Sequence, residues 1–344
     1  MRVGRVAAPV LVVVLALSFG AAARAEPSDW AAAPAPIDTT GSAMDPARLV
    51  SIAPGQGRAL ELVVHSPAMD RDLDLTVLPA RDRAWPAPVL YLLNGVDGGA
   101  GGSWTGNTDI DRFFADRQVT VVVPRGGAGT YFTDWRADDP VLGRQRWTTF
   151  LTRELPPLID TAFLGTGANA IAGVSMAGTS VFQLALAAPG RYRAIGSFSG
   201  CARTSDPQGR AVVSAIVAAH RGDPANMWGP PGDAAWADND PYLHADRLRG
   251  TTVYVSTGTG LPGPLDTLDG PGIGASAAKL TDQLAIGGVL EAITSRCTEQ
   301  LRDRLRDLGI PATFEHRATG THSWGYWQRD LHTAWPVLAA ALNG

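Results

Sequence analysis

The sequence has few cysteines, no run of basic residues and no second long apolar stretch, and each of these absences excludes a class of function. Its 344 residues include two cysteines, with no CxxC pair and no His/Cys cluster, so neither a metal nor another cofactor is indicated. The absence of a Lys/Arg run argues against a nucleic-acid or anionic-membrane partner. Beyond the N-terminus no segment approaches the ~18 apolar residues of a membrane-spanning helix.

The first 25 residues have the three parts of a secretory signal peptide. Arg2 and Arg5 give a basic start, residues 7–22 are apolar, and Ala23-Arg24-Ala25 is a small-x-small cleavage site. A retained N-terminal helix is the alternative, but the apolar run is short for a membrane anchor. We therefore expect export, with cleavage after Ala25 and a location outside the cell or in the envelope.

The chain that remains after cleavage is acidic. Without residues 1–25, which hold three arginines and no acidic residue, the net charge of −4 becomes −7. In an exported protein the two cysteines, Cys201 and Cys297, are expected to pair, although two buried thiols are the alternative.

Composition divides the exported chain into two parts. Residues 26–56 are rich in Ala, Pro, Ser and Thr and lack periodicity, which predicts a flexible leader. Residues 57–344 show no internal repeat and are long enough for one large core. A single domain is predicted there.

The pattern within this domain predicts an α/β fold. Eight short runs of strand character are separated by turn residues: 59–66, 73–79, 88–95, 119–126, 169–175, 194–200, 251–258 and 312–318. The first two alternate like antiparallel strands, and several later ones are continuously apolar like strands buried in a parallel sheet. Helices are predicted over 146–163, after Ser175, and over 297–310. Strand–helix alternation after two antiparallel strands gives a mainly parallel sheet covered by helices.

One serine stands at a junction of strand and helix. Gly173-Val174-Ser175-Met176-Ala177 matches the nucleophile elbow G-x-S-x-G with alanine in the last position. Small residues two before and two after the serine allow the sharp turn that exposes its hydroxyl at a helix N-terminus. The backbone N–H of Met176 would meet an oxyanion there. A serine that merely caps the helix is the alternative.

A nucleophilic serine needs a histidine base and an acid that follow it in the chain. Of six histidines, His322 is the candidate, because it lies in a turn after the last predicted strand; His316 and His332 fall in a predicted strand and a predicted helix. Pattern alone favours Asp266 or Asp269 as the acid, since both follow the strand at 251–258, and Glu291 is the rival.

Five segments resemble one known family. They are IAGVSMAGTS, GTYFTDW, RWTTFLTRELP, NMWGPPGDAAWADNDP and GTHSWGYW, spread over residues 60–344. The chain is similar in these segments to the antigen 85 mycolyltransferases and their corynebacterial relatives, which are secreted α/β-hydrolase enzymes. The resemblance implies transfer of a mycoloyl group from trehalose monomycolate to an envelope acceptor, such as a second trehalose monomycolate, arabinogalactan or a protein hydroxyl.

The family's pattern also assigns roles to residues of this chain. Its acid is a glutamate in a Leu-Glu pair about thirty residues before the histidine, which implies Glu291 rather than an aspartate. Its second oxyanion donor follows the Gly of the LLDGL loop, which reads LLNGV here and implies Val96 beside Met176. In the corynebacterial branch the resemblance implies a Cys201–Cys297 bridge.

Two departures concern sugar binding. Where mycobacterial members have Asp and Arg to hold trehalose, this chain has Asn94 and Asp97. Asn94 is expected to keep hydrogen bonds to sugar hydroxyls, whereas Asp97 reverses the charge. Further substrate contacts are predicted for Trp228, Ser323 and Trp324, with core packing an open alternative for the tryptophans.

Two other functions remain compatible with the sequence. A secreted serine carboxylesterase would use the same residues to transfer the acyl group to water. A non-catalytic envelope- or matrix-binding protein would need none of them, and the presence of Ser175, Glu291 and His322 in their motifs argues against it.

Overall fold

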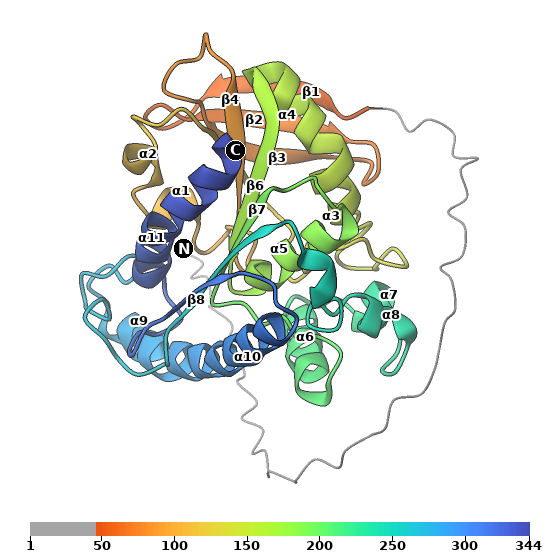
Figure 1. The fold of residues 1–344 in the computed structure, drawn as a ribbon, viewed down its shortest axis with the longest axis vertical. Helices are drawn as coiled ribbons and strands as arrows, with labels where there is room; N and C mark the ends of the chain where they lie inside the picture. The colour runs from red at the N-terminus through yellow and green to blue at the C-terminus, as the bar shows by residue number, and fades with distance from the viewer. Residues whose placement is uncertain (1–45) are drawn as a thin grey trace, which may run out of the picture. The chain divides into compact units, whose positions relative to one another are not determined.

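The computed structural model describes residues 46–344. The predicted signal peptide and most of the predicted leader lie outside this range. One central sheet of nine strands runs through the described chain, in the order β1-β2-β3-β5-β4-β6-β7-β8-β9 (Figure 1). The strands are β1 Arg48–Pro54, β2 Leu60–Ser66, β3 Arg71–Leu78, β4 Ala87–Leu93, β5 Thr120–Pro124, β6 Gly165–Val174, β7 Ala194–Phe198, β8 Thr252–Thr257 and β9 Thr313–His316.

The sheet changes character along this order. β1, β2, β3 and β5 pair antiparallel, and every pairing from β5 through β4 to β9 is parallel. All residues of β4, β5 and β7 are buried, because helices cover both faces of the sheet there. The predicted antiparallel start and parallel remainder are confirmed, as is the α/β-hydrolase fold class.

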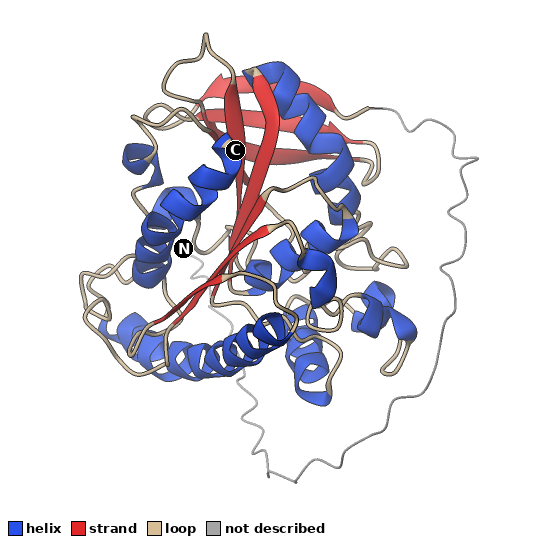
Figure 2. Ribbon diagram, in the orientation of Figure 1, coloured by secondary structure: helices blue, strands red, loops and turns tan. Residues whose placement is uncertain are grey.

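The helices lie in two layers, one on each face of the sheet (Figures 1 and 2). They are α1 Trp104–Asn107, α2 Ile110–Phe113, α3 Trp147–Thr149, the π-helical turn η1 Phe150–Glu154, α4 Leu155–Phe163, α5 Met176–Ala187, α6 Pro207–Ala219, α7 Pro224–Trp228, α8 Ala234–Asp238, the 3-10 turn η2 Ala245–Leu248, α9 Ala277–Asp282, the π-helical turn η3 Gln283–Gly287, α10 Gly288–Asp307 and α11 Trp324–Asn343. None of the helices within residues 46–344 is long and apolar enough to cross a membrane.

Alternate residues of the central strands point into two separate cores. Tyr91 and Leu93 of β4 join the core under α4, α5 and α10, whereas Leu90 and Leu92 join the core under α1, α2 and α11. This period of two is what a strand buried on both faces produces.

Two element boundaries differ from the sequence prediction. The leader was predicted to reach residue 56, but Arg48–Pro54 form β1, which pairs with β2 from Arg48↔His65 to Pro54↔Leu60. All seven residues of β1 are exposed, so the strand lacks the alternation of buried and exposed residues from which strands are predicted. The helix predicted over 297–310 is the end of a longer one: α9, η3 and α10 run continuously from Ala277 to Asp307.

Candidate active site

The carboxyl ends of the parallel strands meet at one edge of the sheet, and the candidate residues follow them. Ser175 comes directly after β6, and the loop with Asn94 and Val96 comes directly after β4. His322 lies between β9 and α11. Ligands of open parallel sheets bind in the crevice outside these strand ends.

Ser175 has the backbone of a sharp elbow. Its φ of 57° is in the left-handed region that non-glycine residues rarely adopt, and its N–H donates to the carbonyl of Phe198 at 2.9 Å. A side-chain carbon at Gly173 would lie 2.7 Å from the carbonyl oxygen of Ala177. Position 173 therefore requires glycine, because the end of β6 lies in contact with the first turn of α5.

His322 joins Ser175 to Glu291. Its Nε2 lies 2.7 Å from Ser175 Oγ, and its Nδ1 lies 2.8 Å from Glu291 Oε2. Because an ionised carboxylate only accepts, Nδ1 carries the hydrogen and Nε2 accepts from the serine hydroxyl. The side chain is 9% exposed, and Trp327 meets its ring edge-to-face with centroids 5.0 Å apart. Packing and hydrogen bonds thus fix both the orientation and the tautomer of the imidazole.

Glu291, on α10, is fully buried, but its carboxylate accepts several hydrogen bonds from the protein. Its Oε1 accepts from Gly258 N–H at 2.5 Å, Ser199 Oγ at 2.9 Å and Thr257 Oγ1 at 3.1 Å. Burial alone would raise the pKa of this carboxyl, but His322, the Gly258 N–H and the Arg317 cation lower it below its usual value. Glu291 is therefore held as an anion beside the imidazole.

The two aspartates favoured by pattern do not contact the histidine. Asp266 accepts from Gly263 N–H at 2.8 Å, Gln283 Nε2 at 2.7 Å and Tyr326 OH at 3.1 Å, and it also bonds the Thr321 hydroxyl. It ties its own loop to the start of α11. Of Glu291, Asp266 and Asp269, the structure brings Glu291 to His322.

The loop after β4 packs against the elbow. A side-chain carbon at Gly95 would lie 3.5 Å from Ser175 Cβ, so the backbone that leads to Val96 passes beside the serine. Met176 directly follows Ser175 and begins α5, where the helix dipole is positive. Both predicted oxyanion donors are thus next to Ser175 in the fold.

Asn94 and Asp97 shape this loop instead of facing a ligand. Asn94 is fully buried; its Nδ2 donates to the carbonyl of Pro124 at 3.1 Å and its Oδ1 accepts from Trp104 N–H at 3.1 Å. Asp97 accepts from the N–H groups of Gly99 at 3.0 Å, Gly101 at 2.7 Å and Gly102 at 3.0 Å. The predicted sugar contact of Asn94 is wrong in this structure, and the carboxylate of Asp97 folds the glycine-rich loop around itself.

Two pockets meet at His322. The apolar pocket reaches Ser175 and Met176. Aliphatic groups form much of its wall, among them Val212, Val213, Ile216, Leu290 and Ile293. The polar pocket, of about 270 Å³, is lined by Gly101, Asn107, Pro271, Gly272, Ile273, Lys279, Asp282, Gln283, Ser323, Trp324 and Trp327. An ester bound at Ser175 could therefore place an acyl chain in one pocket and a polyhydroxylated group in the other.

The predicted substrate contacts divide between these pockets and the core. Ser323 and Trp324 line the polar pocket, and their contact with a substrate stays a prediction. Trp228 is 1% exposed and packs between Tyr131 and Trp236, with ring centroids 5.9 and 5.2 Å away. The substrate contact predicted for Trp228 is wrong, because its ring is enclosed by the core under α5.

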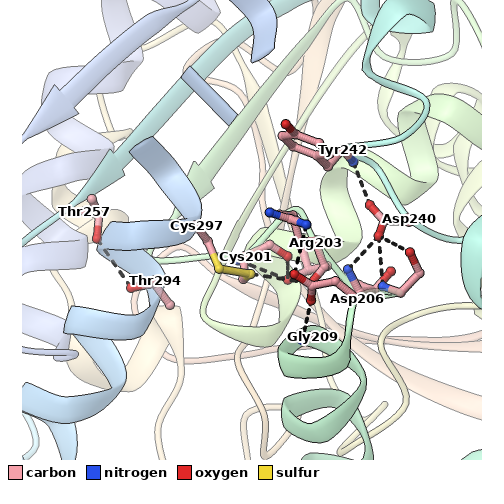
Figure 3. Close-up of a disulfide and its surroundings, with 12 residues drawn as sticks. Cys201, Arg203, Asp206, Gly209, Asp240, Tyr242, Thr257, Thr294 and Cys297 are labelled. Atoms are coloured by element: carbon pink, nitrogen blue, oxygen red, sulfur yellow. Dashed lines mark hydrogen bonds and ion pairs between the residues drawn. A yellow bond between two sulfur atoms is a disulfide. The ribbon is translucent and has the colours of Figure 1, made fainter. Parts of the chain in front are cut away.

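A disulfide joins Cys201 to Cys297, with Cα atoms 5.1 Å apart (Figure 3). Cys201 follows Ser199 by two residues and lines the apolar pocket, and Cys297 stands on α10 six residues after Glu291. The bridge therefore connects the helix that carries Glu291 to the loop that carries one of its hydrogen-bond donors.

Removal of this bridge should lower stability. We expect the double substitution Cys201→Ser/Cys297→Ser to lower the free energy of unfolding by about 3–4 kcal/mol, since the bridge closes a loop of 96 residues. Urea unfolding of the variant, compared with the oxidised wild type and with the wild type in reductant, measures this. An unchanged midpoint would show that the bridge adds no net stability to the fold.

Several residues of the site were not predicted from the sequence. Ser199, Thr257, Gly258 and Arg317 all touch Glu291, and each lies at or just beyond the carboxyl end of a parallel strand. The crevice rule for parallel sheets gives a signal for this location, although it does not select these residues. Among residues 46–344 no group of three or more His, Cys, Asp or Glu side chains could hold a metal ion.

The fold and the Ser–His–Glu arrangement define the class of the protein as an esterase-type α/β-hydrolase. The family model described as putative esterase matches residues 66–338. The chain is 32% identical over 298 residues to diacylglycerol acyltransferase/mycolyltransferase Ag85B of Mycolicibacterium smegmatis, covering 82% of this chain and 85% of that protein. It is 31% identical over 296 residues to the Ag85A protein of Mycobacterium leprae, covering 82% and 83%.

Solved structures agree with these relatives. The crystal structure of Mycobacterium tuberculosis MPT51 (FbpC1) is 26% identical and superposes with a TM-score of 0.65, covering 80% of this chain and 96% of that one. An S-formylglutathione hydrolase from Agrobacterium tumefaciens, 17% identical with a TM-score of 0.59 over 84% and 98% of the two chains, shares the fold. The chain belongs to the putative esterase family, among the Ag85-type mycolyltransferases.

Proposed function

We propose that this chain is an exported serine acyltransferase that moves a mycoloyl group from trehalose monomycolate to an envelope acceptor. The main support is the hydrogen-bonded series from Ser175 Oγ through His322 to Glu291, found in a chain about 30% identical to named mycolyltransferases. Export is supported by the disulfide, because such bonds persist in oxidising compartments. The acceptor can be a second trehalose monomycolate, arabinogalactan or a protein hydroxyl.

Acylation begins with attack of Ser175 Oγ on the ester carbonyl. His322 Nε2 takes the hydroxyl proton, and Glu291 stabilises the imidazolium that forms. The N–H groups of Met176 and Val96 donate to the oxyanion, each worth about 3 kcal/mol of barrier. His322 then gives its proton to the departing trehalose oxygen, leaving the mycoloyl group on Ser175.

Deacylation repeats these steps with an acceptor hydroxyl in place of the serine. The two pockets support this sequence, because the apolar pocket suits a chain and the polar pocket suits a sugar, and His322 borders both. Flat indole rings such as that of Trp324 pack on pyranose faces. A sugar held in the polar pocket would present its hydroxyl to His322 Nε2 in place of water.

Incubation of the purified protein with trehalose monomycolate tests the proposal. We expect trehalose dimycolate on thin-layer chromatography from the wild type and none from the Ser175→Ala variant, because transfer requires the acyl-enzyme. This result would also show that Asp97 is compatible with trehalose as acceptor.

Other products would change the proposal in defined ways. Free mycolate alone would identify a carboxylesterase, which is the second candidate. No reaction by the wild type, with a fold verified by circular dichroism, would favour a non-catalytic envelope-binding protein.

A further inference from the structure

A second buried carboxylate lies behind the acid of the active site. Asp330, on α11, is 1% exposed, and its Oδ2 accepts from Ser256 Oγ at 2.8 Å. Burial raises the pKa of Asp330 to about 6, and the neighbouring Arg317 cation opposes this rise. Asp330 does not contact Ser175 or His322, and the mechanism above gives it no part.

Arg317 lies between the two carboxylates. One guanidinium nitrogen, Nη1, bonds Asp330 Oδ1, and the other, Nη2, lies 3.4 Å from Glu291 Oε1. Its side chain is 5% exposed, and its backbone N–H donates to the carbonyl of Thr257 at 2.9 Å. A planar guanidinium held at both ends is a fixed support, because its donors keep a constant geometry.

From these contacts we infer that Arg317 is a positioning residue for Glu291, and that Asp330 is the anchor that holds Arg317 in place. This inference deepens the proposed function and rests on it. Arg317 directs its charge at Oε1, so Oε2 stays turned toward His322 Nδ1. Asp330 balances the arginine's charge, which would otherwise disfavour a second cation on His322.

The effect of Arg317 and Asp330 on the active site can be measured as a change in the pH dependence of kcat/KM. Glu291 on α10, Tyr254 on β8 and Tyr326 on α11 face the pair, and His322 is reached through Glu291. Burial raises the pKa of Tyr326 to about 12 and that of Tyr254 still further, so both phenols are neutral below pH 9. Above about pH 7 the charged members of this group are therefore Glu291, Arg317 and Asp330, whereas near pH 6 Asp330 is itself partly protonated.

Removing either charge should displace the pH profile in opposite directions. Arg317→Met leaves Glu291 with more net negative charge around it, which favours the imidazolium, so the ascending limb of kcat/KM should move to higher pH by about 0.5 unit. Asp330→Asn leaves the Arg317 charge unbalanced, so the same limb should move to lower pH. A purely structural role would not produce shifts of opposite sign.

The turnover of these variants separates position from charge. We expect Arg317→Met to lower kcat about 10- to 100-fold with KM nearly unchanged, because misplacing Glu291 misaligns the imidazole. Arg317→Lys keeps the positive charge but not the planar arrangement of two donors. The ascending limb of its kcat/KM profile should therefore lie at the wild-type pH, while its kcat is only partly restored. The double variant Arg317→Met/Asp330→Asn restores the charge balance, so its limb should return while its kcat stays low.

The experiment uses the purified full chain, a p-nitrophenyl ester as the probe and a pH range of about 5 to 9. Glu154→Gln is the matched control, since Glu154 is also buried and accepts from Ser66 Oγ at 2.6 Å and Ala68 N–H at 2.8 Å, outside the active site. Three results would overturn the inference. They are a wild-type kcat in Arg317→Met, ascending limbs of kcat/KM that coincide in all variants, and a kcat that recovers fully in the double variant.

Two further outcomes are distinguishable. If Arg317→Met does not fold, the double variant decides, because removing both members of a buried ion pair is far less costly than removing one. Turnover that persists in Ser175→Ala would contradict the proposed function itself. Loss of turnover in Ser175→Ala, with normal Arg317 and Asp330 variants, would contradict the positioning inference alone.

Discussion

Replacement of Ser175 by alanine should lower kcat for ester substrates by about 10⁵- to 10⁶-fold while leaving the fold intact. His322 Nε2 accepts from the Ser175 hydroxyl at 2.7 Å, and among the described residues no other hydroxyl group bonds this nitrogen. Alanine offers neither a nucleophile nor a proton. The residual rate would come from substrate binding and the oxyanion donors acting on water.

Stability should be nearly unaffected by this change. Ser175 makes no side-chain cap bond to α5, and its φ of 57° is held by the contacts of Gly173 and by the N–H bond to Phe198. Alanine keeps the Cβ, so the backbone strain is the same in both proteins. Burst kinetics with a p-nitrophenyl ester and urea unfolding measure the two effects. Substantial turnover by the variant would remove Ser175 from the mechanism.

Local pattern was sufficient for the elements that carry the serine and the histidine. β6 ends in a buried run and nearly all of α5 is buried, and the turn that joins them at Gly173-Val174-Ser175 follows a steric rule that five residues of sequence show. His322 was selected by its place after the last strand. Both inferences depend on neighbours in the sequence, where propensity and spacing are informative.

The acid could not be found in this way. It can stand anywhere in the crevice that lets a carboxylate reach His322 Nδ1, so no local rule distinguishes Asp266 from Glu291. The deciding interactions come from Ser199, Thr257 and Gly258, which lie 92, 34 and 33 residues from Glu291 in the chain. Resemblance to a family, and not the pattern, pointed to the glutamate.

Burial explains the predictions that were wrong. Asn94 and Trp228 carry groups that bind sugars well when exposed, and nothing in the neighbouring sequence shows that loop and core packing enclose them. β1 was missed for the opposite reason, since a strand with all residues exposed leaves no hydrophobic pattern. Arg317 and Asp330 could not be predicted either, because their meeting depends on how α11 packs against the sheet.

Replacement of Glu291 by glutamine should lower kcat by about 10⁴-fold through a change of histidine tautomer. Around Oε1 the Gly258 N–H and the Arg317 guanidinium can only donate, and the hydroxyls of Ser199 and Thr257 also donate there. The amide oxygen of glutamine will therefore occupy the Oε1 position, and its NH₂ group will point at His322 Nδ1.

With the glutamine amide in that orientation, His322 adopts the opposite tautomer. An Nδ1 that must accept carries no hydrogen, so the hydrogen moves to Nε2 and faces Ser175 Oγ, where it blocks proton transfer from the serine. Raising the pH cannot repair this, because the neutral ring itself has the wrong tautomer. We therefore expect kcat of Glu291→Gln to stay low across the whole profile, whereas loss of a general electrostatic effect would change with pH.

Two comparisons make the test specific to the tautomer. Glu291→Asp keeps an acceptor but moves it back by one methylene, so it should retain the pH dependence of the wild type at a lower kcat. Glu154→Gln removes an equally enclosed carboxylate whose donors, Ser66 and Ala68, lie outside the active site. Steady-state kcat with a p-nitrophenyl ester should then fall in the order Glu154→Gln, Glu291→Asp, Glu291→Gln. If Glu291→Gln instead matched Glu154→Gln, His322 would have to be oriented by its packing on Trp327 and its backbone bond to Gly287, and the carboxylate would be needed only to balance Arg317.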